Sequence, residues 1–450
     1  MRWILLIGVL AAVSLAAFAT PFGGSGPDLQ ISIRQADEAD LAVIYEWRKP
    51  RREIVLDGVA GGYRERRWEI ETPGFELRRF VGSDRIVRTD GKKFSRVELT
   101  ARPDLVRIEK EYQPVARYGA GGALVFTGHF WPMTAPKEEG GGRVNASFDF
   151  TPAEGGHVVA FGANEAALAD WRSPMAHPAF VYLGPLDPVE TDHVMALIDP
   201  DAPGWIVDEF NALVPESFDK LAALFGFTPE TKPNLFLAAP LGRDESRLSY
   251  AGDALPAQFQ ITLEGAAWKE KSDKARGIFT NATIHEAVHL WQAAARPGTE
   301  EAPEWIHEGA ADAIAAEVMV ALGEWDSDAY AANERAARTE CARELDTGSL
   351  NGAKARGDFR ALYACGHVIA LAVSRADGKT TADFWRDFIE RAGDDGYSED
   401  MFYDLVADRT GDRDFADALE DFARTPLAEP SRAIDGLFAS AQSLARERGR

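Results

Sequence analysis

The stretch that decides the fold is Thr283-Ile284-His285-Glu286-Ala287-Val288-His289-Leu290-Trp291. On a helix, His285 and His289 lie one turn apart on the same face, where two imidazoles can hold one Zn²⁺ at two corners of a tetrahedron. Glu286 flanks that face, and its carboxylate can reach a water in the open coordination position. The spacing therefore predicts a zinc site with Glu286 beside it. Two core or surface histidines on an amphipathic helix are the alternative explanation.

The residues on either side of this stretch favour a helix. Thr280, Asn281 and Thr283 each offer a side-chain oxygen for an N-cap. Pro297 and Gly298 follow the apolar run and stop it. We therefore expect a helix that begins close to Thr283 and carries both histidines on one face.

A catalytic zinc site needs a third protein ligand, and the next predicted helix offers one. Pro303 is well placed as the first residue of that helix. Eighteen residues separate His289 from Glu308. Asp312 lies one turn beyond Glu308 on the same face, where it can accept the free ring N–H of a zinc-bound histidine. His307 is a competing candidate, and Glu308 is also one acid among several here, but the spacing and the Asp312 partner favour Glu308.

These motifs resemble those of the gluzincin zinc metallopeptidases, the clan of thermolysin. The closest pattern is that of the aminopeptidase N family, whose third ligand sits in a Trp-x-x-Glu-Gly context similar to Trp305-Ile306-His307-Glu308-Gly309. Asp312 is similar to the aspartate four residues after the third ligand in thermolysin. The chain diverges at one motif, because it lacks the Gly-x-Met-Glu-Asn sequence whose glutamate holds the substrate amine in those aminopeptidases. The corresponding window is Gly252–Pro256, where Asp253 could substitute for that glutamate.

The resemblance also implies an oxyanion-stabilising group. Family members carry a tyrosine in a Tyr-x-x-Gly helix after the third ligand, which matches Tyr363 to Gly366. By resemblance, Tyr363 would stabilise the oxyanion, and His367, one turn further on, is a weaker candidate for the same work. A tyrosine that only packs in the core is the alternative.

The implied activity is zinc-dependent hydrolysis of a peptide bond in a peptide or protein substrate. Zn²⁺ would be held by His285, His289 and Glu308, and Glu286 would act as general base on the zinc-bound water. Two other functions stay open. One is a zinc hydrolase that acts on a non-peptide amide or ester, and the other is a non-catalytic zinc-binding protein on the same scaffold.

Hydrophobic periodicity divides the chain into a strand-rich part and a helix-rich part. Residues 28–190 carry short runs that alternate apolar and polar residues, with a hairpin expected at Asp90-Gly91. After about residue 195, helical spacing dominates. Together with the resemblance, this predicts an α+β protein, in which an N-terminal antiparallel β-domain (28–190) precedes a thermolysin-like, mostly helical zincin catalytic domain (195–450).

The second part contains one strand of interest among its helices. Residues 257–263 alternate Phe259 and Ile261 with polar residues, which suggests a half-buried strand. Such a strand could pair with an extended peptide, and a plain core strand is the alternative. Helices are expected over 205–225 and over about 355–375, 380–392, 413–424 and 431–447.

The N-terminus of the 450-residue chain has the features of a targeting segment. Arg2 precedes an apolar run from Ile4 to Ala19, and Ala17-Phe18-Ala19 fits the small-x-small cleavage rule. This predicts a cleavable signal peptide over residues 1–19 and an exported protein, periplasmic or secreted. An uncleaved N-terminal anchor is the alternative. No later segment of the sequence is long and apolar enough to span a bilayer.

Charge and cysteine content exclude other classes of protein. Acidic residues number 72 and basic residues 49, so the net charge of −23 argues against a nucleic-acid binder with a broad cationic face. Cys341 and Cys365 are the only cysteines, which excludes a disulfide framework and an all-cysteine metal site. After export, the two could form one disulfide, and two free buried thiols are the alternative.

Overall fold

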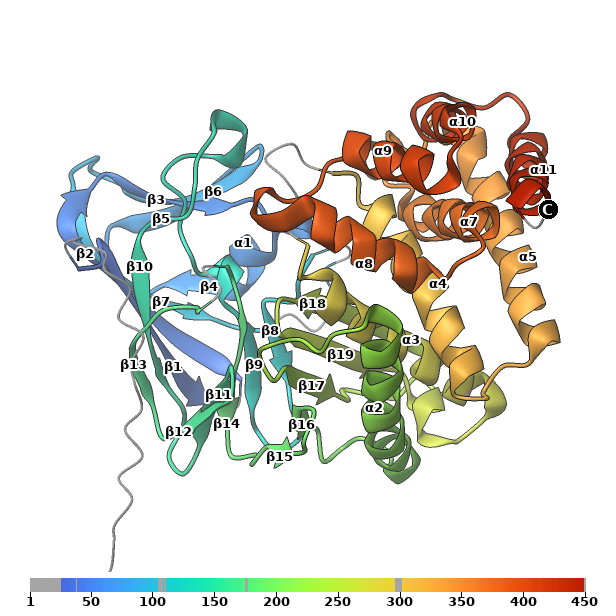
Figure 1. The fold of residues 1–450 in the computed structure, drawn as a ribbon. Coiled ribbons are helices and arrows are strands. Elements are labelled where there is room, and N and C mark those ends of the chain that lie inside the picture. Colours follow the sequence, from blue (N-terminus) through green and yellow to red (C-terminus); the bar gives the residue numbers. More distant parts are fainter. Residues whose placement is uncertain are drawn as a thin grey trace, which may run out of the picture.

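The computed structural model describes residues 26–37, 39–103, 108, 111–174, 177–295 and 302–448. The predicted signal peptide, residues 1–19, lies outside these ranges. Figure 1 shows a β-rich N-terminal part beside a C-terminal part in which helices surround a sheet. This division confirms the predicted order of a β-domain followed by a mostly helical domain. Within the described ranges, no helix combines the length and the apolar character that crossing a bilayer requires.

The N-terminal β-domain is built from sheets whose inward side chains form its core. Along β1, Leu29, Ile31 and Ile33 are buried, as the alternation of apolar and polar residues in the sequence predicts. One sheet has the order β13-β10-β1-β2-β7-β4, another β12-β11-β14-β9-β8, and a small one β3-β6-β5. The described pairs are antiparallel, as predicted, except that β1 and β10 run parallel. The elements are β1 (Leu29–Asp37), β2 (Asp40–Arg51), β3 (Glu53–Asp57), α1 (Tyr63–Arg67), β4 (Trp68–Ile70), β5 (Phe75–Phe80), β6 (Ser83–Arg88), β7 (Phe94–Ala101), β8 (Val115–Arg117), β9 (Ala123–Phe126), β10 (Ala146–Thr151), β11 (His157–Ala160), β12 (Ala163–Glu165), β13 (Leu168–Trp171) and β14 (Phe180–Gly184).

The turn at Asp90-Gly91 forms, but the prediction that it closes a hairpin is wrong. Gly91 has a φ of 69°, and its N–H donates to the carbonyl of Arg88 over 3.1 Å. However, β6 before the turn pairs with β3 and β5, whereas β7 after it pairs with β2 and β4. The turn therefore carries the chain from one sheet to another. Turn residues decide the local backbone, and the packing of apolar faces decides which strands pair.

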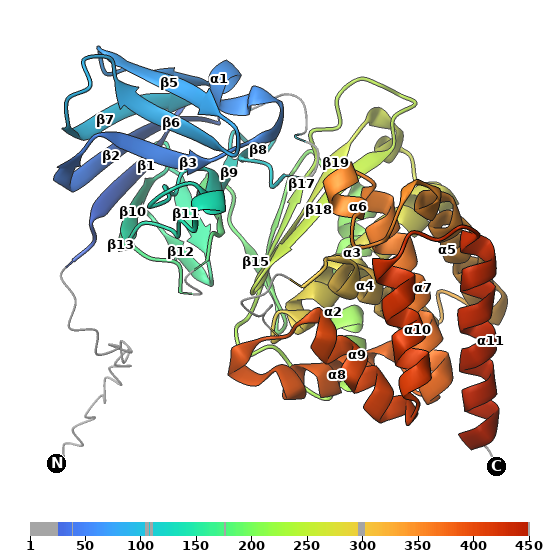
Figure 2. The same ribbon diagram turned by 90° about the horizontal axis from the view of Figure 1, so that it is seen from above.

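A mixed sheet forms the boundary of the C-terminal part. Its order is β15-β16-β17-β19-β18, with β16, β17 and β19 parallel and β18 antiparallel to β19. In Figure 2, β17, β18 and β19 lie between the β-domain and the helices. The strands are β15 (Val189–Glu190), β16 (Met195–Ile198), β17 (Asn234–Ala238), β18 (Ser249–Leu255) and β19 (Gln258–Glu264).

The strand expected over 257–263 exists as β19, but its setting differs from the prediction. Residues Gln258 to Leu263 are all buried, so the strand is not half-buried. β19 is paired on both edges, with β17 and with β18, and it therefore has no free edge for a peptide. Among the described strands, the edges of this sheet are β15 and β18, which the sequence pattern does not reveal.

The helices agree with the predicted ranges to within a few residues, with one large difference. α3 begins at Asp273, because the side chain of Ser272 caps it by accepting the N–H of Ala275 over 3.1 Å. The expected N-cap at Thr280 to Thr283 is therefore wrong. The helices are α2 (Gly204–Phe225), α3 (Asp273–Gln292), α4 (Trp305–Ala321), α5 (Ser327–Glu344), α6 (Ala353–Arg356), α7 (Phe359–Asp377), α8 (Thr381–Ala392), α9 (Glu399–Thr410), α10 (Arg413–Arg424) and α11 (Pro430–Arg448).

A disulfide joins two of these helices. Cys341 on α5 and Cys365 on α7 are both fully buried and bonded to each other. The structure thus has the disulfide rather than two free thiols.

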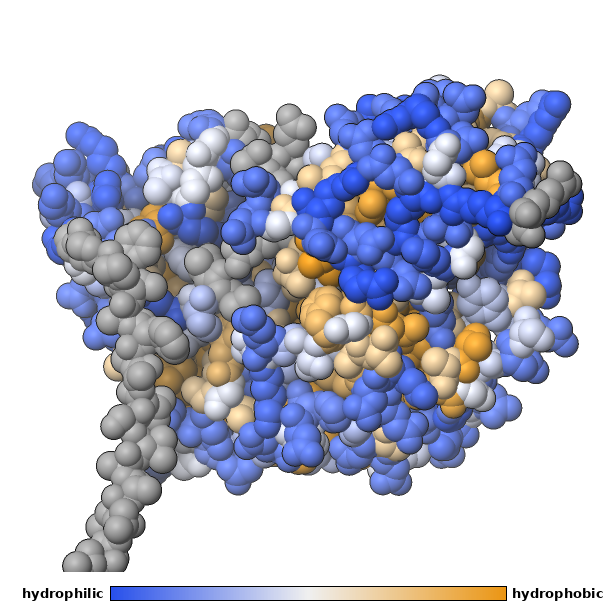
Figure 3. Space-filling model, viewed as in Figure 1, coloured by the Kyte–Doolittle hydropathy of each residue, from blue (hydrophilic) through white to orange (hydrophobic). Residues whose placement is uncertain are grey.

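Figure 3 shows hydrophilic residues over most of this face of the helical part, with hydrophobic residues gathered below α8.

The two parts of the chain share an apolar interface reinforced by one buried carboxylate. Side chains of the β-domain sheet pack on the outer face of β16 and β17, and they include Leu124, Phe126, Phe180 and Tyr182 against Leu197, Phe236 and Ala238. Asp199, buried at the end of β16, accepts the N–H of Gly119 from the β-domain over 2.9 Å. Its other oxygen accepts the N–H of Ala239 over 3.0 Å. These contacts hold the β-domain against the sheet that carries β18.

A carboxylate also connects α4 with α8. Glu317 of α4 accepts the N–H of Thr381 over 2.6 Å and that of Ala382 over 3.4 Å, both in the first turn of α8. Burial raises the pKa of Glu317 to about 7, although those hydrogen bonds oppose the shift. The side chain is therefore protonated in the folded protein at a pH where it is ionised in the unfolded chain.

This shift predicts a pH-dependent effect of Glu317→Gln on stability. Between about pH 4.5 and 7 the folded chain binds the Glu317 proton and the unfolded chain does not. The free energy of unfolding of the wild type therefore falls as the pH rises through this range. Glutamine keeps the acceptor oxygen and does not ionise. The free energy of unfolding of the variant, relative to that of the wild type, should rise by up to about 3 kcal/mol from pH 5 to pH 8. Urea unfolding at the two pH values measures this, and an equal difference at both would contradict it.

Candidate metal centre

The two motif histidines meet at one point beside the sheet. His285 and His289 lie one turn apart on α3, and their Nε2 atoms are 3.2 Å apart. Their ring centroids are 4.8 Å apart with the planes nearly perpendicular, at 84°. The buried side chains of Ile284, Val288 and Trp291 fix the rest of this part of α3 in the core. The two imidazole nitrogens therefore converge because the opposite face of the helix is packed.

Glu308, in the first turn of α4, brings a carboxylate oxygen to the same point. Its Oε2 lies 3.3 Å from Nε2 of His285 and 3.3 Å from Nε2 of His289. Tetrahedral Zn²⁺ with bonds of about 2.0–2.1 Å requires donor atoms about 3.3 Å apart. The triangle of donor atoms therefore has the size of one face of a zinc tetrahedron, and two imidazoles with a carboxylate suit Zn²⁺.

The charges of the three residues are strongly coupled. Burial alone would raise the pKa of Glu308, but His289 and His285 outweigh it and hold this pKa well below its usual range. Burial would lower the pKa of His285, but Asp312 and Glu308 raise it well above its usual value. The cluster thus favours an ionised carboxylate next to a positive charge, and a bound dication would replace the imidazole proton.

Outer hydrogen bonds orient both histidines. Nδ1 of His285 lies 2.8 Å from Oδ1 of Asp312, as the sequence predicted. Nδ1 of His289 lies 2.7 Å from Oε1 of Gln292, whose Nε2 donates to the carbonyl of His307 over 3.0 Å. If both acceptors fix the Nδ1–H tautomer, each Nε2 is left free to bind a metal. Gln292 was missed in the sequence, although its position three residues after His289 on one helix is a usable signal.

Removal of either acceptor should weaken zinc binding. Asp312→Ala and Gln292→Ala each leave one histidine without the partner that sets its tautomer, so zinc affinity should fall by about 10–100-fold. Competition with a chromophoric chelator measures this affinity. Glu324→Gln is the matched control, because Glu324 pairs with Arg276 of α3 over 2.7 Å and does not touch the histidines. Unchanged affinity in both alanine variants would contradict the assigned roles.

Glu286 lies between α3 and one face of β18. Its side chain is buried, and burial raises its pKa while His285 and His289 lower it. A Cβ atom at Gly252 of β18 would overlap the carboxylate of Glu286, so the strand can approach this closely only with glycine there. The carboxylate is therefore next to both the histidines and the edge strand.

Tyr363 and His367 of α7 approach the same site to different degrees. The ring of Tyr363 lies 5.9 Å from that of His285. Burial, and then the carboxylates of Glu308 and Glu286, raise the pKa of Tyr363, so its hydroxyl stays protonated and able to donate. His367 is buried beside Asp312, and burial lowers its pKa. Among the described residues its Nε2 has no hydrogen-bond partner.

His307, the rival candidate for the third ligand, lies further from the point of convergence. Its Nε2 is 3.7 Å from Oε1 of Glu308, whereas the two motif histidines lie 3.3 Å from the other oxygen, Oε2. The cluster of possible metal donors that the described residues form consists of His285, His289 and Glu308 without His307.

Two glycines set the distance between α4 and α7. A Cβ at Gly309 would overlap the backbone of Gly366, and a Cβ at Gly366 would overlap the carbonyl oxygen of Trp305. Both residues belong to the sequence patterns that contain Glu308 and Tyr363. The glycines thus allow the backbones to touch, and this contact positions Glu308 of one helix relative to Tyr363 of the other.

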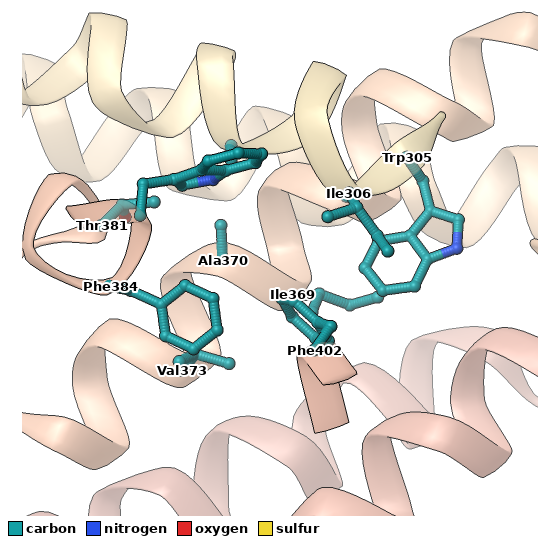
Figure 4. Close-up of a pocket in the computed structure, with 11 residues that line it drawn as sticks. Trp305, Ile306, Ile369, Ala370, Val373, Thr381, Phe384 and Phe402 are labelled. Atoms are coloured by element: carbon teal, nitrogen blue, oxygen red, sulfur yellow. The ribbon is translucent and has the colours of Figure 1, made fainter. Parts of the chain in front are cut away.

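Apolar packing around the contact between α4 and α7 also supports α4. Figure 4 shows Trp305 and Ile306 of α4 beside Ile369 and Phe402, with Ala370 and Phe384 further along. These side chains leave a cavity of only about 10 Å³. Close packing of this kind resists displacement of the first turn of α4, which carries Glu308.

The contact between the two glycines predicts the effect of Gly309→Ala. The added methyl group must push α4 and α7 apart, which should lower the free energy of unfolding by about 1–3 kcal/mol and weaken zinc binding. Gly277→Ala is the control, because an added Cβ there meets nothing within 4 Å on α3. That variant should bind zinc normally and be up to about 1 kcal/mol more stable. Equal stability and zinc affinity in both variants would contradict the role of Gly309.

Asp253 lies on the other face of β18. Successive residues of a strand point to opposite faces, so Asp253 points away from the face on which Gly252 meets Glu286. Its carboxylate accepts a hydrogen bond from Gln260, and together with Glu111 and Gln113 it lines a cavity of about 400 Å³ between the β-domain and the sheet.

Comparison with known proteins supports the fold. No protein-family model and no curated protein matches the sequence. An aminopeptidase N family protein from Idiomarina loihiensis is similar in structure, with a TM-score of 0.63, 13% identity, and coverage of 89% of this chain and 76% of that one. Yeast LTA4 hydrolase in complex with bestatin gives a TM-score of 0.53 at 11% identity, over 89% of this chain and 67% of that one. Legionella pneumophila aminopeptidase A, in complex with aspartic acid, gives 0.50 at 11% identity, over 90% of this chain and 50% of that one. At these identities the chain shares the two-part fold of such proteins.

Proposed function

We propose that the chain is an exported zinc metallopeptidase that hydrolyses peptide bonds in a peptide or protein substrate. The observation that carries the proposal is the triangle of donor atoms from His285, His289 and Glu308, with edges of 3.2–3.3 Å. Glu286 adds an acid–base group beside that triangle. The fold is shared with an aminopeptidase N family protein at 13% identity, and a peptidase function is compatible with that fold.

The residues of the site suit the chemistry of water attack on an amide. Zn²⁺ bound by the triangle would polarise the scissile carbonyl and lower the pKa of a water molecule. Glu286 accepts the proton of the attacking water and passes it to the leaving amine. Tyr363, held protonated by burial and by nearby carboxylates, donates a hydrogen bond to the oxyanion of the substrate. Asp312 and Gln292 keep the two imidazoles oriented.

Export is supported by the disulfide between Cys341 and Cys365. Such bonds persist in oxidising compartments and are rare in the reducing cytosol. The apolar run from Ile4 to Ala19 is consistent with export by a signal peptide. A periplasmic or secreted location accounts for both features.

Two other functions share the same scaffold, and Glu286 distinguishes one of them. A zinc site that only stabilises the fold needs no extra carboxylate, whereas Glu286 is buried next to the donor triangle. A zinc hydrolase that acts on a non-peptide amide or ester would keep Glu286. Parallel screens of a peptide library and of small amides and esters separate this alternative from a peptidase.

Glu286→Gln and His289→Ala should lose activity for different reasons. Glu286→Gln should keep about one zinc per chain and lose about 10²–10⁴-fold in kcat/KM, because it removes only the proton acceptor. His289→Ala should lose zinc as well as activity, because it removes a ligand. Metal analysis and cleavage of a peptide library measure both. Full activity of Glu286→Gln would refute the proposed mechanism.

A further inference from the structure

The tip of the hairpin between β5 and β6 exposes two adjacent apolar side chains. Phe80 and Ser83 are register partners, so Val81 and Gly82 form a two-residue turn between the strands. Val81 is fully exposed, and Phe80 is 47% exposed. The N–H of Gly58 donates to the carbonyl of Gly82 over 3.1 Å, which holds the turn against the β-domain. Such turns usually carry small polar residues, so the packing of the fold does not account for an apolar tip here.

Two arginines face each other across the hairpin, close to this tip. Arg78 of β5 and Arg85 of β6 are register partners, so their side chains are neighbours on one face of the sheet. Like charges in directly opposite positions destabilise a strand pair. The guanidinium of Arg85 also lies over the ring of Phe80, 4.7 Å from its centroid. The hairpin thus keeps cations beside its apolar tip at a cost in stability.

The arginines near the tip also have acidic partners at the surface. The pairs are Arg78 with Glu76, Arg79 with Glu65 and Arg85 with Glu53. Ion pairs between side chains that water reaches contribute little to stability. The guanidinium groups can therefore exchange these carboxylates for phosphates, which arginine binds in a bidentate manner.

The charge of the chain is divided unevenly around this hairpin. Residues 41–103 contain 15 basic and 10 acidic residues, a net charge of +5, whereas the whole chain has a net charge of −23. The rest of the chain therefore carries a net charge of −28. In Figure 2, β5 and β6 lie at one end of the molecule and α11 lies at the other. An anionic surface would attract the end with the hairpin and repel the rest, which would orient the molecule.

We propose that the β5–β6 hairpin docks the protein on the surface of an anionic phospholipid membrane. Phe80 and Val81 enter the boundary between the lipid headgroups and the acyl chains. Arg78, Arg79 and Arg85 bind the phosphates of the surrounding lipids. This role is separate from the proposed zinc chemistry and does not depend on it.

A membrane suits the hairpin better than a protein partner does. A specific protein interface buries about 800 Å² on each partner. The exposed apolar surface here consists of two side chains at a turn. A small apolar wedge with basic residues behind it is sufficient for reversible binding to an anionic bilayer.

Sedimentation with lipid vesicles tests this proposal. The wild type should bind vesicles of mixed phosphatidylglycerol and phosphatidylcholine at least about tenfold more strongly than vesicles of phosphatidylcholine alone. Added salt should weaken the binding to the mixed vesicles, because it screens the charges of lipid and arginine. Absence of binding to the mixed vesicles, or equal binding to both kinds, would overturn the proposal.

Two variants separate the apolar contribution from the charged one. Val81→Asp should lower the partition coefficient on the mixed vesicles by about tenfold or more, and should fold normally because Val81 is fully exposed. Arg78→Gln should lower it by about fivefold, because it removes one cation from the lipid phosphates. The matched controls are Val189→Asp on β15, where Val189 is 51% exposed, and Arg432→Gln on α11. Both controls should bind like the wild type, and equal losses in Val81→Asp and Val189→Asp would contradict a role of the tip.

A fluorescent label reports directly on the position of the tip. Both native cysteines are held in the disulfide, so Val81→Cys and Val189→Cys each offer one thiol for an environment-sensitive dye. With the mixed vesicles, the emission of labelled Val81→Cys should shift to shorter wavelength, and that of labelled Val189→Cys should not. Binding of labelled Val81→Cys without this shift would place the contact elsewhere on the molecule and overturn docking by the hairpin.

Discussion

Convergence of three donor atoms from two helices is the constraint on which the rest of the site depends. Nε2 of His285 and of His289 come from α3, and Oε2 of Glu308 comes from α4, within 3.3 Å of both. A shift of either helix by a few tenths of an ångström would spoil a tetrahedral site. The surrounding structure holds this geometry. Asp312 and Gln292 orient the imidazoles. The contact of Gly309 with Gly366 fixes the position of Glu308 on α4 relative to α7.

The helical motifs could be predicted from the sequence because their geometry is local. His285 and His289 share a helix face by their spacing alone, and Asp312 follows Glu308 by one turn. The structure brings these four residues together as expected. Gln292 was missed because its role depends on the rotation of the His289 ring, which the spacing does not fix. The start of α3 was missed because Ser272 competes with three later residues that are equally suitable as caps.

Strand pairing could not be predicted in the same way, because it depends on contacts between distant segments. The turn at Asp90-Gly91 is a good local signal, yet the strands on either side of it join different sheets. β19 was correctly placed as a strand, but nothing in its own residues shows that β18 would cover its outer edge. Tyr112 is the clearest case. It belongs to the β-domain, and only the packed interface brings its hydroxyl to Ala254 of β18.

X-ray absorption at the zinc edge, on the purified wild type and on His307→Ala, tests the ligand set most directly. We expect one zinc per chain, with two imidazole nitrogens and one carboxylate oxygen at about 2.0–2.2 Å, and the same spectrum for both proteins. A protein that retains no zinc would contradict a zinc site at these residues. So would a wild-type spectrum with three imidazole nitrogens that falls to two in His307→Ala, because His307 would then take the place of Glu308.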